Sequence, residues 1–175
     1  MRDRLRAIFR GGPEVDGKAT YLALRTMVFE VDPQTIEVSR ETHLRPAWCA
    51  LLEFGVDSGT ATLVAVADGT VSFYTSTGGG VIGAGEHHAV RAAAERFLDE
   101  AAEASVFMRQ AADIPSTPSA GNVALHVRTF DATLSKELPE DALVRGRHEL
   151  SQLYAAGQDL LTEVRLLDEA AEGSD

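Results

Sequence analysis

A hairpin, a glycine-rich bend and a long helix follow one another in the middle of this chain, and together they constrain its fold most. Thr60–Ala67 and Thr70–Thr75 are rich in β-branched and aromatic residues, and Asp68-Gly69 separates them. This dipeptide is typical of a two-residue type I′ turn, in which both positions need positive φ. The pattern therefore predicts an antiparallel β-hairpin, with a helix over 86–103 after the bend.

An apolar run over 47–55 precedes the hairpin and reads as a buried strand. The turn residues 57–59 join this run to the hairpin, and short turns join antiparallel neighbours. We therefore expect a three-strand meander over 47–55, 60–67 and 70–76. Cys49 lies within the first of these strands among apolar neighbours, so we expect a packed thiol rather than a reactive one.

Two further segments extend the predicted fold. Apolar residues at helical spacing predict an amphipathic helix over 18–31, although the β-formers of 26–31 also allow a strand. Residues 122–129 alternate between apolar and polar side chains, which predicts a fourth strand. His126 and Arg128 share the polar face of this strand, and we favour a solvent-facing position for them over the mouth of a site.

Some segments have weaker patterns. Residues 36–38 alternate like a brief strand within the unassigned stretch 34–46, and 130–138 reads as irregular. Residues 1–10 are basic with one apolar face, which we interpret as an end docked on the domain in preference to a partner-binding or membrane-surface arm. We expect the ends, over 1–17 and 171–175, to be flexible.

The order of these elements predicts a single α+β domain over 1–175. Its sheet is mainly antiparallel, a three-strand meander plus one later strand, with helices covering one face and a long C-terminal helix. The net charge of −11 disfavours nucleic acid as a partner. No apolar run is long enough for a membrane span, no export signal is recognisable, and a single cysteine fits a reducing compartment, so we expect a cytoplasmic protein.

The C-terminal segment carries apolar residues at spacings of three and four, the seam through which two helices pack side by side. A glycine in this seam costs about 1 kcal/mol of helix stability against alanine, but it permits close backbone approach. We favour packing of the seam inside the domain, and self-association through it is the alternative. The residues of this candidate interface are Leu150, Leu153, Gly157, Leu160, Val164 and Leu167.

The glycine-rich bend matches G-x-G-x-x-G over 78–83. A hairpin precedes it in place of a βαβ unit, which argues against a dinucleotide site. We favour a flexible surface loop or sheet bulge, in which Val81-Ile82 makes a short fourth hairpin arm, over an anion or small-ligand site at the amides before the helix. The residues that would line such a ligand site are Tyr74, Thr75, Thr77, Gly80, His87 and His88.

Signatures of catalysis are weak in this chain. There is no G-x-S-x-G elbow, and adjacent His87 and His88 would point about 100° apart on a helix, so we expect neither a metal nor another cofactor. We therefore expect a non-enzymatic protein-binding or regulatory module that assembles through a helix face or a sheet edge. The alternative is a small-molecule-binding protein or enzyme with its site at the bend over 76–88.

Overall fold

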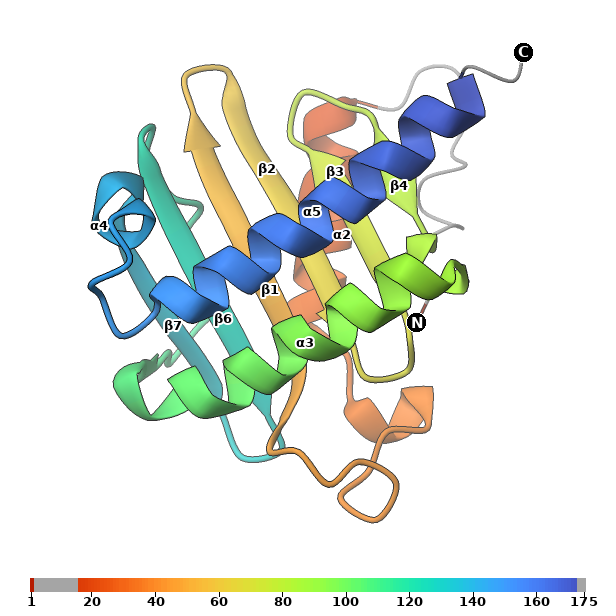
Figure 1. Cartoon of the computed structure of the whole chain (residues 1–175), viewed down its shortest axis with the longest axis vertical. Coiled ribbons are helices and arrows are strands. Elements are labelled where there is room, and N and C mark those ends of the chain that lie inside the picture. The colour runs from red at the N-terminus through yellow and green to blue at the C-terminus, as the bar shows by residue number, and fades with distance from the viewer. Residues whose placement is uncertain (2–15, 173–175) are drawn as a thin grey trace.

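A seven-stranded antiparallel sheet forms the centre of the computed structural model, which describes residue 1 and residues 16–172 (Figure 1). The strand order is β4-β3-β2-β1-β6-β7-β5, and helices cover the sheet, which confirms the mixed α+β class. Apart from Met1, the basic segment over 1–10 lies outside the described residues. Among the helices described, none combines the length and the apolar character that crossing a bilayer requires.

The predicted meander is confirmed as β1 (Ala47–Val56), β2 (Gly59–Val66) and β3 (Val71–Thr75), which pair antiparallel in chain order. The prediction of a type I′ turn between β2 and β3 is wrong, because only Gly69 of the Asp68-Gly69 dipeptide has positive φ, at 85°. The Gly69 amide donates to the carbonyl of Val66, and the glycine follows this turn in the left-handed region. This is the longer hairpin connection that ends in a left-handed residue.

Four more strands complete the sheet. β4 (Gly80–Ile82) pairs with β3, as the fourth hairpin arm predicts, and β6 (Asn122–Thr129) pairs with β1. The irregular reading of 130–138 is wrong, since β7 (Thr133–Pro139) pairs with β6 along its whole length. The two-residue strand β5 (Arg109–Gln110), which the sequence pattern does not predict, adds to the outer side of β7.

The predicted helix over 18–31 is confirmed as α2, with Asp16 capping its first turn. The prediction of a brief strand at 36–38 is wrong, because Pro33 starts a 3₁₀ turn there. Glu37 caps the end of this turn in the left-handed region, with a φ of 62°. Two longer helices and one short helix follow. The described helices are α2 (Gly17–Glu30), α3 (His88–Ala104), α4 (Glu140–Val144) and α5 (Ser151–Glu172), and the 3₁₀ turns are η1 (Pro33–Ile36), η2 (Ala84–Glu86) and η3 (Ser105–Phe107).

Helices cover both faces of the sheet, which corrects the expectation that they cover one. Helices α3 and α5 lie side by side over one face, and α2 lies behind the opposite face (Figure 1). Each face has its own apolar cluster. Leu52 and Leu63 belong to the cluster under α3 and α5, whereas Leu51 and Val64 pack with residues of α2. Successive residues of a strand therefore point to opposite faces of the sheet and pack into two separate apolar clusters.

The seam of α5 packs within the chain. Leu150, Leu153, Leu160 and Val164 are buried in the cluster shared with α3 and the sheet, and Leu167 is half-buried at its margin. Gly157 lies where the helix approaches most closely, because a Cβ there would be 2.6 Å from Leu52 Cδ2 and 3.1 Å from Phe97 Cε2. The glycine in the seam thus permits close helix–sheet packing.

Candidate functional site

The sheet face under α2 carries a row of polar side chains. The strand register places Glu53 of β1 beside Thr62 of β2, and Thr62 beside Tyr74 of β3. His126 of β6 pairs with Leu51, which lies two residues before Glu53 on β1, so His126 is on the same face of the sheet as Glu53. The solvent-facing position expected for His126 is wrong, since α2 covers this face and leaves the side chain 1% exposed.

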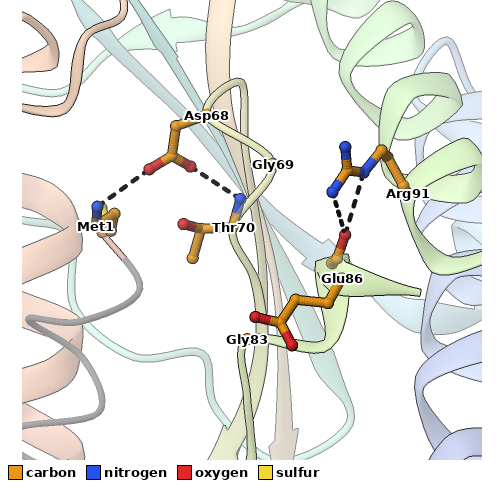
Figure 2. Close-up of a pocket in the computed structure, with 8 residues that line it drawn as sticks. Met1, Asp68, Gly69, Thr70, Gly83, Glu86 and Arg91 are labelled. Carbon is orange, nitrogen blue, oxygen red and sulfur yellow. Dashed lines mark hydrogen bonds and ion pairs between the residues drawn. The ribbon is translucent and has the colours of Figure 1, made fainter. Parts of the chain in front are cut away.

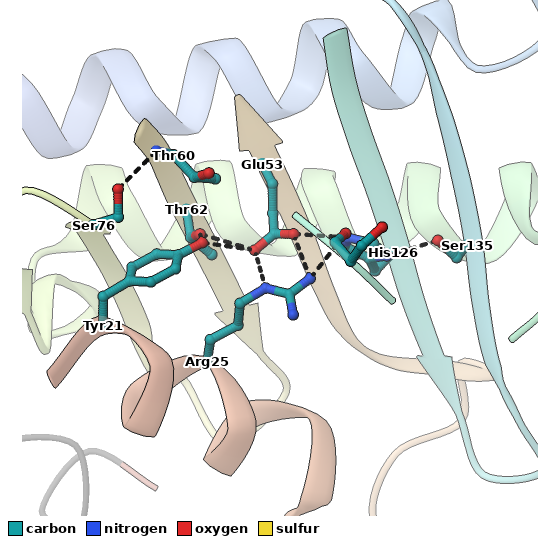
Figure 3. A network of polar contacts seen from close by, with 9 residues as sticks. Tyr21, Arg25, Glu53, Thr60, Thr62, Ser76, His126 and Ser135 are labelled. Carbon is teal, nitrogen blue, oxygen red and sulfur yellow. Dashed lines mark hydrogen bonds and ion pairs between the residues drawn. The ribbon is translucent and has the colours of Figure 1, made fainter. Parts of the chain in front are cut away.

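A hydrogen-bonded network centred on Glu53 joins α2 to this face (Figure 3). Arg25 donates from Nε to Glu53 Oε1 and from Nη2 to Oε2, both at 2.8 Å, in a bidentate ion pair. Thr62 Oγ1 donates to Oε1 at 2.9 Å, and the Tyr21 hydroxyl lies 3.0 Å from Thr62 Oγ1. His126 Nε2 lies 3.0 Å from Oε2. The carboxylate is therefore satisfied by groups from one helix, α2, and two strands, β2 and β6.

The bonding partners of His126 show which ring nitrogen donates to Glu53. Nε2 faces the Glu53 carboxylate, which can only accept, and Nδ1 lies 2.9 Å from the Ser135 hydroxyl. A neutral ring that donates from Nε2 accepts at Nδ1, and the Ser135 hydroxyl can supply that proton. Nε2 therefore donates to the carboxylate, and Arg25 and Glu53 form the ion pair of the network.

Electrostatics keep Glu53 ionised at neutral pH. Burial by itself raises the pKa of Glu53, but the hydrogen bonds from Arg25 and His126 outweigh burial and bring the pKa to about 2. Burial and the nearby Glu53 charge raise the pKa of Tyr21 to about 12. The carboxylate is closed off from solvent, at 0% exposed. The network therefore holds α2 in place on the sheet.

The residues predicted to line a ligand site are not brought together. Tyr74 points to the α2 side, where its ring meets Tyr21 edge-on at 5.7 Å, and it is 1% exposed. Thr75 and Thr77 bond to each other across the β3–β4 turn, at 3.2 Å between hydroxyls. His87 and His88 are exposed at the start of α3, beyond the far end of β4. Gly80 lies in β4, between Thr77 and His87 in the sequence.

No metal-ligand set occurs in the part of the chain that the structure describes. Three or more His, Cys, Asp or Glu side chains do not gather there in a geometry that could hold an ion. Cys49 is fully buried, and burial raises the pKa of its thiol to about 12, so it is not poised as a ligand or a nucleophile.

The outer edge of β4 presents backbone groups that β3 does not use. The Gly83 amide donates to the Val71 carbonyl at 3.0 Å, and the Thr75 amide donates to the Gly79 carbonyl at 3.2 Å. Because backbone groups alternate in direction along a strand, the N–H and C=O of Gly80 and Ile82 point away from β3. Within 16–172, no strand pairs with this side of β4.

The two edges of the sheet differ in their protection. On the far edge, β5 covers part of β7, and the remainder of β7 carries Lys136, Glu137 and Pro139. Charged residues, proline and a short covering strand are the usual means of blocking edge-to-edge pairing. β4 consists of Gly80, Val81 and Ile82 and has neither charge nor proline. Of the two sheet edges within 16–172, the β4 edge is the one without a charge, a proline or a covering strand, and it can accept an added strand.

A small cleft lies where β4 ends (Figure 2). It has a volume of about 230 Å³, and its walls come from the β2–β3 turn at 68–70, from Gly83, Gly85 and Glu86 after β4, and from Met1 and Arg91. The Met1 ammonium group lies 3.1 Å from Asp68 Oδ2, and the Thr70 amide donates to Asp68 Oδ1 at 2.8 Å. Sequence patterns reveal the turn but not the cleft, because its walls come from distant segments.

No protein family model, no curated protein and no solved structure matches this chain.

Proposed function

We propose that this protein is a non-enzymatic protein-binding module, which takes up an extended segment of a partner protein as an added strand on β4. The observation that carries the proposal is the outward direction of the Gly80 and Ile82 backbone groups on an uncharged sheet edge. In this mode of recognition, main-chain hydrogen bonds supply affinity, and neighbouring side chains select alternate residues of the added strand.

The surroundings of β4 support strand addition. Helix α5 crosses the sheet towards β4, and its C-terminal end passes over that edge (Figure 1). Val81 faces this side of the sheet, and Leu161 and Leu167 of α5 are half-buried at the margin of the same apolar cluster. Alternate side chains of an added strand would extend this cluster, so the partner segment should carry an apolar residue beside Val81.

The charge of the chain supports a basic partner. With a net charge of −11, the protein attracts cationic segments and repels a second copy of itself, which favours a different protein as the partner. The network around Glu53 is closed to solvent and gives a substrate no access to its polar groups, and this supports a binding role over catalysis. The buried, unpaired Cys49 fits a reducing interior, so we keep the cytoplasm as the proposed location.

The proposal can be tested with Ile82→Pro. Proline removes the outward N–H at position 82, which bonds nothing in the described structure, and it obstructs an added strand. The inward bonds of Val81 and Gly83 remain. Ile82→Ala is the matched control, because it loses the same side chain but keeps the N–H. The two variants should unfold within roughly 1 kcal/mol of each other.

Binding is measured with a displayed library of random decapeptides, selected against the intact protein and then synthesised. We expect selected peptides to bind the wild type and Ile82→Ala, and to bind Ile82→Pro at least roughly tenfold more weakly. Amide NMR shifts on binding should be largest at Gly80 and Ile82. An empty selection, or peptides that bind both variants equally, would contradict strand addition.

A further inference from the structure

We infer that the cleft at the Ile82 end of β4 recognises an ammonium group of the bound partner segment, with Asp68 as its acceptor. This inference rests on the proposed function, since it assigns a chemical preference to one end of the added strand. The ligand chemistry is a primary ammonium, supplied either by a lysine side chain or by a free N-terminus.

The cleft already binds such a group. The α-ammonium of Met1 lies 3.1 Å from Asp68 Oδ2, and the Asp68 side chain is only 15% exposed. The Thr70 amide holds the other carboxylate oxygen at 2.8 Å, so Oδ2 is fixed in direction towards the cleft (Figure 2). A partly buried, oriented carboxylate is a stronger acceptor for a cation than an exposed one.

The other charges of the cleft leave room for a cation. Arg91 donates from Nε and Nη2 to the Gly85 carbonyl, at 3.2 and 3.1 Å, and so turns its guanidinium group to the backbone. Glu86 adds a second carboxylate to the lining. With the guanidinium group of Arg91 turned to the backbone, Asp68 Oδ2 is the carboxylate oxygen that contacts the ammonium group. The site therefore favours one incoming positive group.

The position of the cleft matches the path of an added strand. Gly83 follows Ile82 directly, and both Gly83 and Gly85 line the cleft. A strand advances about 3.3 Å per residue, so the residue just past Ile82 on an added strand reaches this space. Met1 and the partner then compete for one carboxylate, which makes the Met1 contact autoinhibitory.

The test uses Asp68→Asn. This variant keeps an oxygen for the Thr70 amide but removes the charge that binds the ammonium group. Asp141→Asn is the matched control, because Asp141 is an exposed carboxylate on α4 and its loss changes the net charge equally. The probes are peptides from the selection described above, each made with a free or acetylated N-terminus and with lysine or norleucine at each lysine position.

We expect removal of one ammonium group to weaken binding to the wild type by roughly tenfold to a hundredfold. The acetylated peptide identifies the N-terminus as the source, and the norleucine peptide identifies lysine. The loss should vanish in Asp68→Asn and persist in Asp141→Asn. If peptides bind through β4 but Asp68→Asn leaves their preference intact, the ammonium site is refuted and strand addition stands.

A second measurement does not depend on finding a peptide. The Met1 amine should react slowly with an acylating reagent in the wild type and in Asp141→Asn, and several times faster in Asp68→Asn. Equal labelling rates in the wild type and Asp68→Asn would overturn the ammonium site even if the peptide selection returned nothing. Faster labelling of the wild type with a bound peptide would support competition for Asp68.

Discussion

Replacement of Arg25 by methionine should destabilise the folded protein by about 3–5 kcal/mol at neutral pH. Methionine keeps an unbranched side chain of similar length but removes the cation. Both bidentate hydrogen bonds to Glu53 are lost, and the carboxylate, which is 0% exposed in the wild type, loses the guanidinium charge beside it. A buried charge without its partner is the costly outcome, because desolvation is no longer offset.

The pKa of Glu53 gives a second estimate of this energy. The pKa lies at about 2, against an ordinary value of 4.5, and the difference corresponds to about 3 kcal/mol. Because the folded-state pKa is lowered, this stability is present above about pH 4.5 and is lost as the pH falls towards 2. Without Arg25, burial raises the pKa of Glu53, and protonation then stabilises the variant. The difference between wild type and Arg25→Met should therefore shrink as the pH falls from 7 to 3.

Urea denaturation followed by the fluorescence of Trp48, the single tryptophan, measures both effects, since this side chain is fully buried. Arg145→Met is the control, because Arg145 forms an exposed pair with Asp141 and should change the free energy of unfolding by less than about 0.5 kcal/mol. A change below about 1 kcal/mol for Arg25→Met at pH 7, or a change that does not depend on pH, would refute the role assigned to the ion pair.

Three further variants or reactions test the packing. Gly157→Ala should lower the free energy of unfolding by about 1 kcal/mol, because crowding against Leu52 exceeds the gain in helix propensity; a rise in urea midpoint would contradict this. The Cys49 thiol, whose pKa burial raises to about 12, should react with a thiol reagent at pH 8 only in proportion to the unfolded fraction in urea, and fast reaction of the native protein would disprove its burial. Glu37→Gly should raise the free energy of unfolding by roughly 0.5 kcal/mol, because glycine adopts the left-handed φ of 62° at position 37 without strain. The control Glu95→Gly, within α3, should lower the free energy of unfolding by about 1 kcal/mol. Equal shifts of the two variants in calorimetry would rule out strain at position 37.

Local pattern was sufficient for the elements that carry strong periodicity. The meander and the helix over 17–30 follow from runs of β-formers, short turns and a 3.6-residue apolar repeat. β7 was missed because its middle residues, Lys136 and Glu137, disfavour a strand, and pairing with β6 overrides that preference. The 3₁₀ turn at Pro33 was missed because three alternating residues after it imitate a strand.

The polar network could not be predicted from the sequence, although its signals are present. Glu53 is the only charged residue in an otherwise apolar strand, and Arg25 lies one helical turn after Tyr21 on a face that is otherwise apolar. A buried charge implies a buried partner, but 28 residues separate these two. Either face of the sheet could have received the helix, so the sequence pattern alone does not bring Arg25 to Glu53.

The same network connects to the proposed binding edge through α2. An amphipathic helix could pack on either apolar cluster, but only the face that carries Glu53 neutralises Arg25, so the ion pair selects the side on which α2 lies. With α2 in that position, its first residue, Gly17, touches the β3–β4 turn, since a Cβ there would be 3.2 Å from Gly78 Cα. That turn leads directly into β4, whose Gly80 and Ile82 form the proposed binding edge. The ion pair between Arg25 and Glu53 therefore stabilises the fold and also places α2 beside the turn that leads into the proposed binding edge.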